Sequence, residues 1–273
     1  MKILHLTDIH LTTPGESISG CDPNANFEAA LAHALSLHSD AALMVITGDL
    51  SDWGEQADYE RLRARLADLP MPVGLCIGNH DDRATFLDVF PERADPLGFA
   101  QGVFDLPGAR CLFLDTWGPE THAGHFCATR QAWLAARLDE HDGPFLIFLH
   151  HNPIPSHVAP MDSIMLLDHQ AFGEVLRPRA ERIRHIFHGH CHLPMAGSLH
   201  GIPVTSSRGT NHAGWPAFEE GELLTGADLP AAYAVAFVQP SAITVHMVEF
   251  AAAQTVQRGA SPDYATWDKG MAR

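Results

Sequence analysis

Five short segments of this chain carry side chains that can bind divalent metal ions. In chain order they are Asp8-Ile9-His10, Thr47-Gly48-Asp49, Gly78-Asn79-His80-Asp81, His150-His151 and Gly189-His190-Cys191-His192. Each follows a short apolar run typical of a buried strand. Carboxylate and amide oxygens and imidazole nitrogens are ligands that divalent metals take in proteins. Their order and placement predict that five strand ends together hold a pair of divalent ions.

The spacing within two of the segments indicates how an ion could be held. Asp8 and His10 are separated by one residue, as are His190 and His192. On an extended segment, two such side chains point the same way, so we expect each pair to grip an ion together. Two ions about 3.5–4 Å apart could activate a bridging water for in-line attack on phosphorus, without a covalent protein intermediate.

Taken one at a time, the motifs have plainer explanations. A polar residue after a strand is more often a helix cap or turn former than a ligand, and Gly78-Asn79 alone is typical of a tight turn. The chain holds 19 histidines, so histidine content by itself proves nothing. Only the ordered set, each member after a strand, favours a metal centre. Histidines outside the motifs that we treat as structural or surface residues are His5, His33, His38, His185 and His200.

Composition restricts the possible partners and location. The chain has 273 residues, 46% of them hydrophobic, and a formal net charge of −16 with only 17 Lys and Arg, which argues against a nucleic-acid polymer. Its five cysteines show no short paired spacing, so we expect reduced thiols. No apolar stretch approaches the ~20 residues of a membrane span, and the first expected strand begins almost at Met1. We therefore expect no membrane contact, no secretory leader and a cytoplasmic location.

Strands and helices alternate over the first two-thirds of the chain. Short apolar runs predict buried strands at 2–7, 42–47, 73–77, 111–114, 145–149 and 183–188. Apolar residues three and four apart predict helices around 27–35, 59–69 and 133–138. This alternation is typical of an α/β domain.

The composition changes after His192. Runs at 195–199, 203–206, 234–238 and 243–248 look like strands without helices between them, which implies a second sheet. Residues 209–230, rich in Gly, Pro and Glu, predict a long loop at the rim of a site or at a subunit contact. We expect one domain over 1–250 and a loosely ordered tail over 251–273. Loop residues that could reach the pocket rim are Asp52, His122, Met161, Asp162, His169 and His212.

The ordered motifs resemble the calcineurin-like metallophosphoesterase superfamily. Gly20-Cys21-Asp22, Gly78-Asn79-His80-Asp81 and His150-His151-Asn152-Pro153 are similar to its class III phosphodiesterases, which include bacterial cyclic-nucleotide phosphodiesterases and glycerophosphodiesterases. The resemblance implies an α/β fold, a four-layer αββα sandwich with two mixed sheets flanked by helices. It also places the ions at the strand ends.

Carried to individual residues, the resemblance implies two ion sites that share Asp49 as a bridge. The first ion would be held by Asp8, His10, Asp49 and His192, and the second by Asp49, Asn79, His150 and His190. The resemblance also implies that His80 contacts the phosphate or helps the leaving oxygen depart, with Asn79 beside the substrate. His151 would line the pocket or support its loop. Iron, manganese, cobalt and zinc, in a divalent or mixed-valent pair, all suit these ligands.

The leading function is therefore hydrolysis of a small phosphodiester, a cyclic nucleotide or a glycerophosphodiester, by a metal-bridging hydroxide. An alternative is a phosphomonoesterase or nucleotide pyrophosphatase on the same site, since specificity depends on the rim. A non-catalytic scaffold should lack one or more ligands, and a nuclease is disfavoured by the acidic charge. By analogy with the family we expect a homo-oligomer, a dimer or larger.

Overall fold

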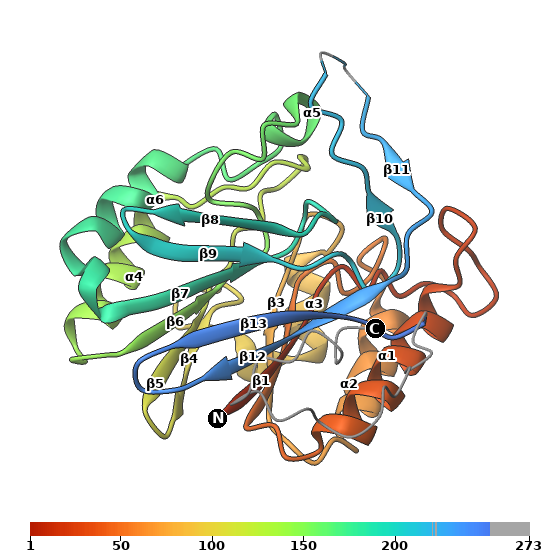
Figure 1. Ribbon diagram of the computed structural model, residues 1–273, viewed down its shortest axis with the longest axis horizontal. Coiled ribbons are helices and arrows are strands. Elements are labelled where there is room, and N and C mark those ends of the chain that lie inside the picture. The colour runs from red at the N-terminus through yellow and green to blue at the C-terminus, as the bar shows by residue number, and fades with distance from the viewer. Residues whose placement is uncertain (220, 222, 252–273) are drawn as a thin grey trace, which may run out of the picture.

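Two β-sheets pack face to face, and helices cover their outer faces (Figure 1). The structure, a computed structural model, describes residues 1–219, 221 and 223–251. Three hydrophobic clusters fill its layers, one between the sheets and one between each sheet and its helices, and a smaller fourth cluster contains Met161 and Leu193. The predicted αββα sandwich is confirmed.

The first sheet has five strands in the order β13-β12-β1-β2-β3. Its strands are β1 (Lys2–Leu6), β2 (Leu43–Thr47), β3 (Val73–Cys76), β12 (Ala232–Val238) and β13 (Ile243–Glu249). Strands β1, β2 and β3 run parallel to one another, and β12 is antiparallel to both of its neighbours, β1 and β13. Its outer face carries α1 (Pro23–His38), α2 (Gln56–Leu66) and α3 (Arg83–Val89), which pack through Phe27, Tyr59 and Phe86.

The second sheet has six strands in the order β4-β5-β6-β7-β9-β8. They are β4 (Gly102–Leu106), β5 (Ala109–Phe113), β6 (Phe145–Phe148), β7 (Ile183–His188), β8 (Met195–Leu199) and β9 (Ile202–Ser206). Strands β5, β6, β7 and β9 are parallel. The outer face is covered by α4 (Ala128–Asp139) and α6 (His169–Leu176), which contribute Leu134 and Phe172 to its core. Shorter helical turns are α5 (Ala159–Asp162), η1 (Pro91–Arg93) and η2 (Arg177–Arg182).

The prediction that the C-terminal strands form a sheet of their own is wrong. The β8–β9 hairpin extends the sheet of β4 to β7, and the β12–β13 hairpin extends the sheet of β1 to β3. Each hairpin pairs the backbone of a strand, β7 or β1, that would otherwise be an exposed edge. The hydrophobic pattern of a strand identifies it as a strand but carries no information about its neighbour. The short elements β4, α3 and α6 were not predicted.

The segment 209–230 is not wholly irregular. It contains a small antiparallel ribbon, in which β10 (Ala213–Gly214) pairs with β11 (Gly226–Ala227) and which stands out from the sandwich (Figure 1). The predicted tail, 251–273, lies outside the described residues except for Ala251. Over the described part of the chain, no helix is both long and apolar enough to cross a membrane. All five cysteines are free.

The core between the sheets leaves the strand ends as the place for polar side chains. Phe113, Phe148 and Phe187 form a continuous stack there, with ring centroids 5.5 and 5.0 Å apart. Because aromatic rings fill this layer, chemistry is confined to the loops that follow the strands. The loops after β1, β2, β3, β6 and β7 carry all five motifs.

Candidate metal centre

The first group of predicted ligands lies together. Donor atoms of Asp8, His10, Asp49 and His192 are all within 4.8 Å of one another, and all four residues are buried. His10 Nε2 is 3.6 Å from Asp49 Oδ2, and His192 Nε2 is 3.4 Å from Asp8 Oδ1. These are the four residues predicted for the first ion.

The second predicted group adjoins the first through Asp49. Asn79 Oδ1 is 3.0 Å from His150 Nε2 and 2.7 Å from His190 Nδ1. His150 Nε2 is also 3.4 Å from Asp49 Oδ1. The two oxygens of Asp49 therefore face different groups, Oδ2 toward His10 and Oδ1 toward His150. One carboxylate lies between both sets of donors.

The backbone brings these side chains together in an unexpected way. Five candidate ligands have positive φ: Asp8 (53°), His10 (46°), Asp49 (47°), His190 (69°) and His192 (51°). The expectation that Asp8 with His10, and His190 with His192, lie on extended segments is therefore wrong. A non-glycine residue in this left-handed region costs about 1 kcal/mol or more and persists only where the surroundings require it. Such strain gathered on the candidate ligands is characteristic of a functional site.

Two glycines allow the loops to approach this closely. At Gly48, where φ is 91°, an added Cβ would meet His150 Nδ1 at 2.5 Å. At Gly189 it would meet Thr7 Oγ1 at 1.8 Å. Any side chain at either position would push the strand ends apart, which explains why glycine precedes Asp49 and His190.

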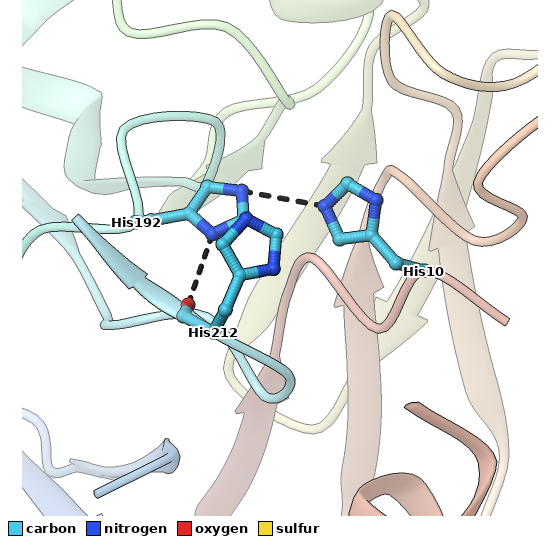
Figure 2. A group of neighbouring side chains, drawn as sticks. All are labelled: His10, His192 and His212. Atoms are coloured by element: carbon cyan, nitrogen blue, oxygen red, sulfur yellow. Dashed lines mark hydrogen bonds between the residues drawn. The ribbon is translucent and has the colours of Figure 1, made fainter. Parts of the chain in front are cut away.

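Three of the imidazoles are oriented by hydrogen bonds from Nδ1, which is the arrangement that outer partners give metal-binding histidines. The bonds are His10 Nδ1 to Asp52 Oδ1 (2.9 Å), His150 Nδ1 to the Thr47 carbonyl (2.7 Å) and His192 Nδ1 to the His212 carbonyl (3.0 Å). Figure 2 shows the last of these, with the Nε2 atoms of His10 and His192 turned toward each other. Each ring thus donates from Nδ1 and presents the lone pair of Nε2 to the centre.

The resulting contacts pair acceptors with acceptors. His10 Nε2 and His192 Nε2 are 3.3 Å apart, and His150 Nε2 is 3.0 Å from Asn79 Oδ1. Asp8 Oδ2 is buried and has no hydrogen-bond partner among the described residues. Facing lone pairs and an unpaired buried oxygen are unfavourable unless a cation lies between them. The donor set therefore fits divalent metal ions.

The charged groups around Asp49 also favour a bound cation. Burial opposes ionisation of the His150 imidazole, but the Asp49 carboxylate outweighs it and raises the pKa of His150 to about 9. Burial acts against the Asp49 carboxylate as well, yet His150 and the neighbouring imidazoles hold its pKa well below the usual range. The site attracts positive charge, which a proton or a metal ion can supply.

A family model described as calcineurin-like phosphoesterase matches residues 1–194 of this chain. The chain belongs to this family. Among the relatives of this phosphoesterase is a probable cyclic nucleotide phosphodiesterase of Rhodopseudomonas palustris, 36% identical over 256 residues that cover 92% of this chain and 93% of the relative. The glycerophosphodiester phosphodiesterase GpdQ of Enterobacter lignolyticus is 30% identical and covers 80% of this chain and 77% of its own.

Solved structures share the fold at much lower identity. A dimetal phosphatase from Danio rerio superposes with a TM-score of 0.68 at 15% identity, over 91% of this phosphoesterase and 96% of that chain. The predicted family and fold are confirmed. The predicted enzyme class, a metal-dependent phosphoric diester hydrolase, is confirmed by the family match and by the relatives.

His80, predicted to contact the phosphate, and His151, predicted to line the pocket or support its loop, lie in different surroundings. His80 lines a cavity of about 780 Å³ that also borders candidate ligands such as His10 and Asp49, and its Nδ1 is 2.9 Å from the Asp52 carbonyl. His151 is fully buried, with Nδ1 2.8 Å from Thr116 Oγ1 and Nε2 3.3 Å from the His122 carbonyl. In this phosphoesterase His151 therefore faces protein groups on both sides of its ring, whereas His80 borders open space.

Four of the six rim candidates line the cavity: Asp52, His122, Met161 and His212. Two of them orient candidate ligands with their side chains, since Asp52 accepts from His10 and His122 Nδ1 lies 3.0 Å from Asn79 Nδ2, and His212 orients His192 with its backbone carbonyl. Because the amide nitrogen of Asn79 faces His122, the amide oxygen at the other end of the group faces His150 and His190. The Asp162 carboxylate instead accepts hydrogen bonds from the backbone N–H groups of Ser156 and His157.

Asp81 has a structural role that the sequence analysis did not assign. Its buried carboxylate accepts hydrogen bonds from the backbone N–H groups of Leu50, Ser51 and Gly78 and from the Tyr59 hydroxyl. Burial raises the pKa of Asp81 to about 6. The bonds tie the loop after β2 to the loop after β3, so Asp49 and Asn79 are held in register. The only available signal was its place at the end of the Gly78 to Asp81 motif.

Proposed function

We propose that this phosphoesterase uses two divalent metal ions to hydrolyse a small phosphodiester, and that the substrate is a cyclic nucleotide. The observation that carries the proposal is the position of Asp49, whose two oxygens face separate sets of donors. Asp8, His10 and His192 would complete the first ion site, and Asn79, His150 and His190 the second. When bound, the ions would supply the Lewis acidity that lowers the pKa of an attacking water and neutralises the phosphate oxygens.

His80 is the side chain best placed to act on the substrate. Its Nδ1 faces the Asp52 carbonyl and the Asp52 carboxylate lies 3.4 Å away, so the ring is oriented. The ring borders the cavity, and its centroid is 4.8 Å from that of His10. From there His80 can donate a hydrogen bond to the phosphate or a proton to the leaving oxygen.

The lining of the cavity favours a nucleotide over a glycerol ester. Its volume of about 780 Å³ is within the usual range for small-molecule sites. Apolar residues in its lining include Ile18, Val158, Met161, Ile164, Leu193 and Trp215. A nucleobase can bury its faces against such a surface, whereas a glycerol headgroup would leave it unused. The name of the 36% identical relative supports the same substrate class.

A substrate panel with defined metals tests this proposal. Protein stripped by chelator and reloaded with manganese, iron, zinc or cobalt is assayed on 3',5'- and 2',3'-cyclic nucleotides, a glycerophosphodiester, bis(p-nitrophenyl) phosphate and p-nitrophenyl phosphate. We expect turnover of cyclic nucleotides and of the artificial diester, with two ions bound per chain. Clear preference for the monoester, or for a nucleoside pyrophosphate, would replace the proposal with the alternative activity. Preference for the glycerophosphodiester would correct the substrate alone.

We further propose that residues 1–250 act as one metallophosphoesterase domain, with 209–230 as the cavity rim, in a homo-oligomer. Trp215, Leu223 and Leu224 line the cavity mouth and are 51%, 82% and 56% exposed. Apolar side chains exposed this far on one ribbon are suited to a protein contact. Light scattering on the purified chain measures its mass, and a monomer at micromolar concentration would exclude the oligomer.

A further inference from the structure

Two segments far apart in the chain supply most of the apolar residues in the cavity lining. One is the stretch around α5, which contributes Val158, Met161 and Ile164, and the other is the β10–β11 ribbon with the connection between its strands. Both stand at the same end of the sandwich (Figure 1). The ribbon lies beyond residues 1–194, the part of the chain that matches the family model, so the family match leaves its role open.

The ribbon places a large aromatic side chain in the cavity. Among the described residues of the lining, Trp215 is the only Trp, Phe or Tyr. The side chain is 51% exposed, so about half of its surface is free for a ligand to cover. An indole offers a broad flat face on which another ring system can stack. Trp215 is therefore suited to a ligand that carries an aromatic ring.

Hydrogen bonds on both sides fix the backbone of Trp215. Its N–H donates to the Thr225 carbonyl at 2.7 Å, across the ribbon. Its own carbonyl accepts from the N–H of Ala217 at 2.8 Å. Because both polar groups of its backbone are bonded, the residue that carries the indole is held in place before any ligand arrives, which reduces the entropy lost on binding.

The start of the ribbon is attached to the loop after β7. The N–H of Gly214 donates to the His192 carbonyl at 3.0 Å. A Cβ at Gly214 would meet the Cys191 carbonyl at 3.0 Å and Leu193 Cδ2 at 3.3 Å, so this close contact favours glycine. Trp215 thus follows a residue that is bonded to a predicted ligand of the first ion. In a nucleotide only the sugar separates the base from the phosphate, so a phosphate at the ions brings the base toward this part of the ribbon.

We propose that Trp215 is a specificity-determining residue, whose indole stacks on the base of a nucleotide substrate. The inference rests on the proposed function and deepens it, because it names the residue that recognises the base. Stacking reads the flat face that every base has, and it tolerates different bases. Trp215 therefore favours nucleotides over glycerophosphodiesters without selecting one base.

The first experiment measures the contribution of the base to binding and does not depend on turnover. Adenosine 5'-monophosphate and ribose 5-phosphate share the sugar and the phosphate and differ only in the base. Calorimetry on the zinc-loaded chain should give a ratio of their affinities of about 10 or more, falling to about 1 to 3 in Trp215→Ala. Trp215→Phe, which retains a ring, should keep a ratio between these values. The affinity for ribose 5-phosphate should stay within about twofold in both variants, since the phosphate site is unchanged.

Phe218→Ala is the matched control. Phe218 lies in the same connection between β10 and β11 and is 70% exposed, but it is not among the described residues that line the cavity. This variant should keep the ratio of the unmodified chain. Equal affinities of the two ligands for the unmodified chain, an unchanged ratio in Trp215→Ala, or an equal fall in Phe218→Ala would overturn the proposal. A smaller oligomer in Trp215→Ala alone would also overturn it, because the ring would then belong to a subunit contact.

The second experiment follows turnover of 3',5'-cyclic adenosine monophosphate. Trp215→Ala should lower kcat/KM about 10-fold and bind the same number of metal ions as the unmodified chain. An unchanged kcat/KM, or a loss of metal ions, would overturn the proposal. If the unmodified chain hydrolyses no diester, the proposed function fails, whereas the ratio of the two affinities still decides the role of Trp215.

Discussion

Two sets of buried histidines in this phosphoesterase show how partners, not burial, determine what a side chain can do. His5 and His185 lie in the layer between the sheets, packed against Phe187 with ring centroids 5.6 and 4.3 Å away. His10 and His150 lie at the strand ends. All four are at most 5% exposed.

The two sets differ in the groups that meet their ring nitrogens. His5 Nε2 is 2.8 Å from Thr47 Oγ1, and His185 Nε2 is 2.9 Å from Thr205 Oγ1, so each core ring has one neutral hydroxyl partner. Burial lowers the pKa of His5 to about 3 and that of His185 to about 4. At the strand ends, carboxylates face the rings, and Asp49 overcomes burial to raise the pKa of His150 to about 9. At His10 and His150, a carboxylate lies beside the ring and offsets the effect of burial on its pKa.

Asp49→Ala should have the largest effect, because it removes the carboxylate that distinguishes the two environments. We expect kcat/KM to fall by at least about 10³-fold and both metal ions to be lost. Metal content by mass spectrometry and hydrolysis of bis(p-nitrophenyl) phosphate measure this.

Asp95→Ala is the matched control: Asp95 is also a buried carboxylate, but its partners are Leu97 N, Phe99 N and Gln101 Nε2, away from the centre. That variant should lose stability and keep its metals. Full activity in Asp49→Ala would refute the bridge.

Asn79→Ala should mainly empty the second ion site. Its amide oxygen meets both His150 and His190, so its loss should leave about one ion per chain and lower kcat/KM about 10²- to 10³-fold. His122→Ala, which only frees the amide nitrogen, should weaken metal affinity by about 10-fold. Titration of the stripped protein with manganese compares the two. Unchanged stoichiometry in Asn79→Ala would show that the amide is not a ligand.

His80→Ala should reduce turnover and leave metal binding intact. Its ring borders the cavity and its Nδ1 is held by Asp52, so we expect kcat to fall about 10²-fold, the lower end for loss of a general acid or base. Metal content should remain at two ions per chain. If the variant loses an ion instead, His80 belongs with the ligands and its assignment here is wrong.

His185→Phe should leave activity unchanged and alter only the pH dependence of stability. The folded pKa of about 4 is below the unfolded value of 6.5, so the unfolded state binds more protons and stability is lost as pH falls from 6.5 toward 4. Without that histidine, the loss between pH 7.5 and pH 5 should be smaller by about 2 kcal/mol. Urea unfolding at both pH values measures it.

The exposed His246 provides the control for that experiment. His246→Phe makes the same substitution at an exposed position and so measures the effect of the new side chain by itself. An equal change in the free energy of unfolding at pH 7.5 and pH 5 in His185→Phe would mean that the core histidine is not held neutral by burial.

Most elements of the fold could be predicted from local sequence. Apolar runs identified β1, β2, β3, β5, β6 and β7 to within two residues at each end, because buried strands consist almost entirely of apolar residues. Stripes of apolar residues identified α1, α2 and α4. The short elements β4 and α3 were not predicted. A strand of five mostly half-buried residues and a helix of seven residues show too little periodicity in the sequence. The assignment of β8 and β9 to a sheet failed because pairing partners are chosen by tertiary contacts.

The sequence by itself determined which residue types follow which strands, and this was enough to predict the family, the fold and two sets of candidate ligands. The tertiary structure alone decided how those side chains are presented. The left-handed backbone at Asp8 and His192, the Thr47 carbonyl that orients His150 and the Asp52 carboxylate that orients His10 are not visible in any local pattern. The reason is distance along the chain: His150 and Thr47 are 103 residues apart, and His190 N–H reaches Asp8 across 182. Periodicity reports on neighbours within a few residues, whereas the position of a proton on an imidazole depends on whichever segment folds against it.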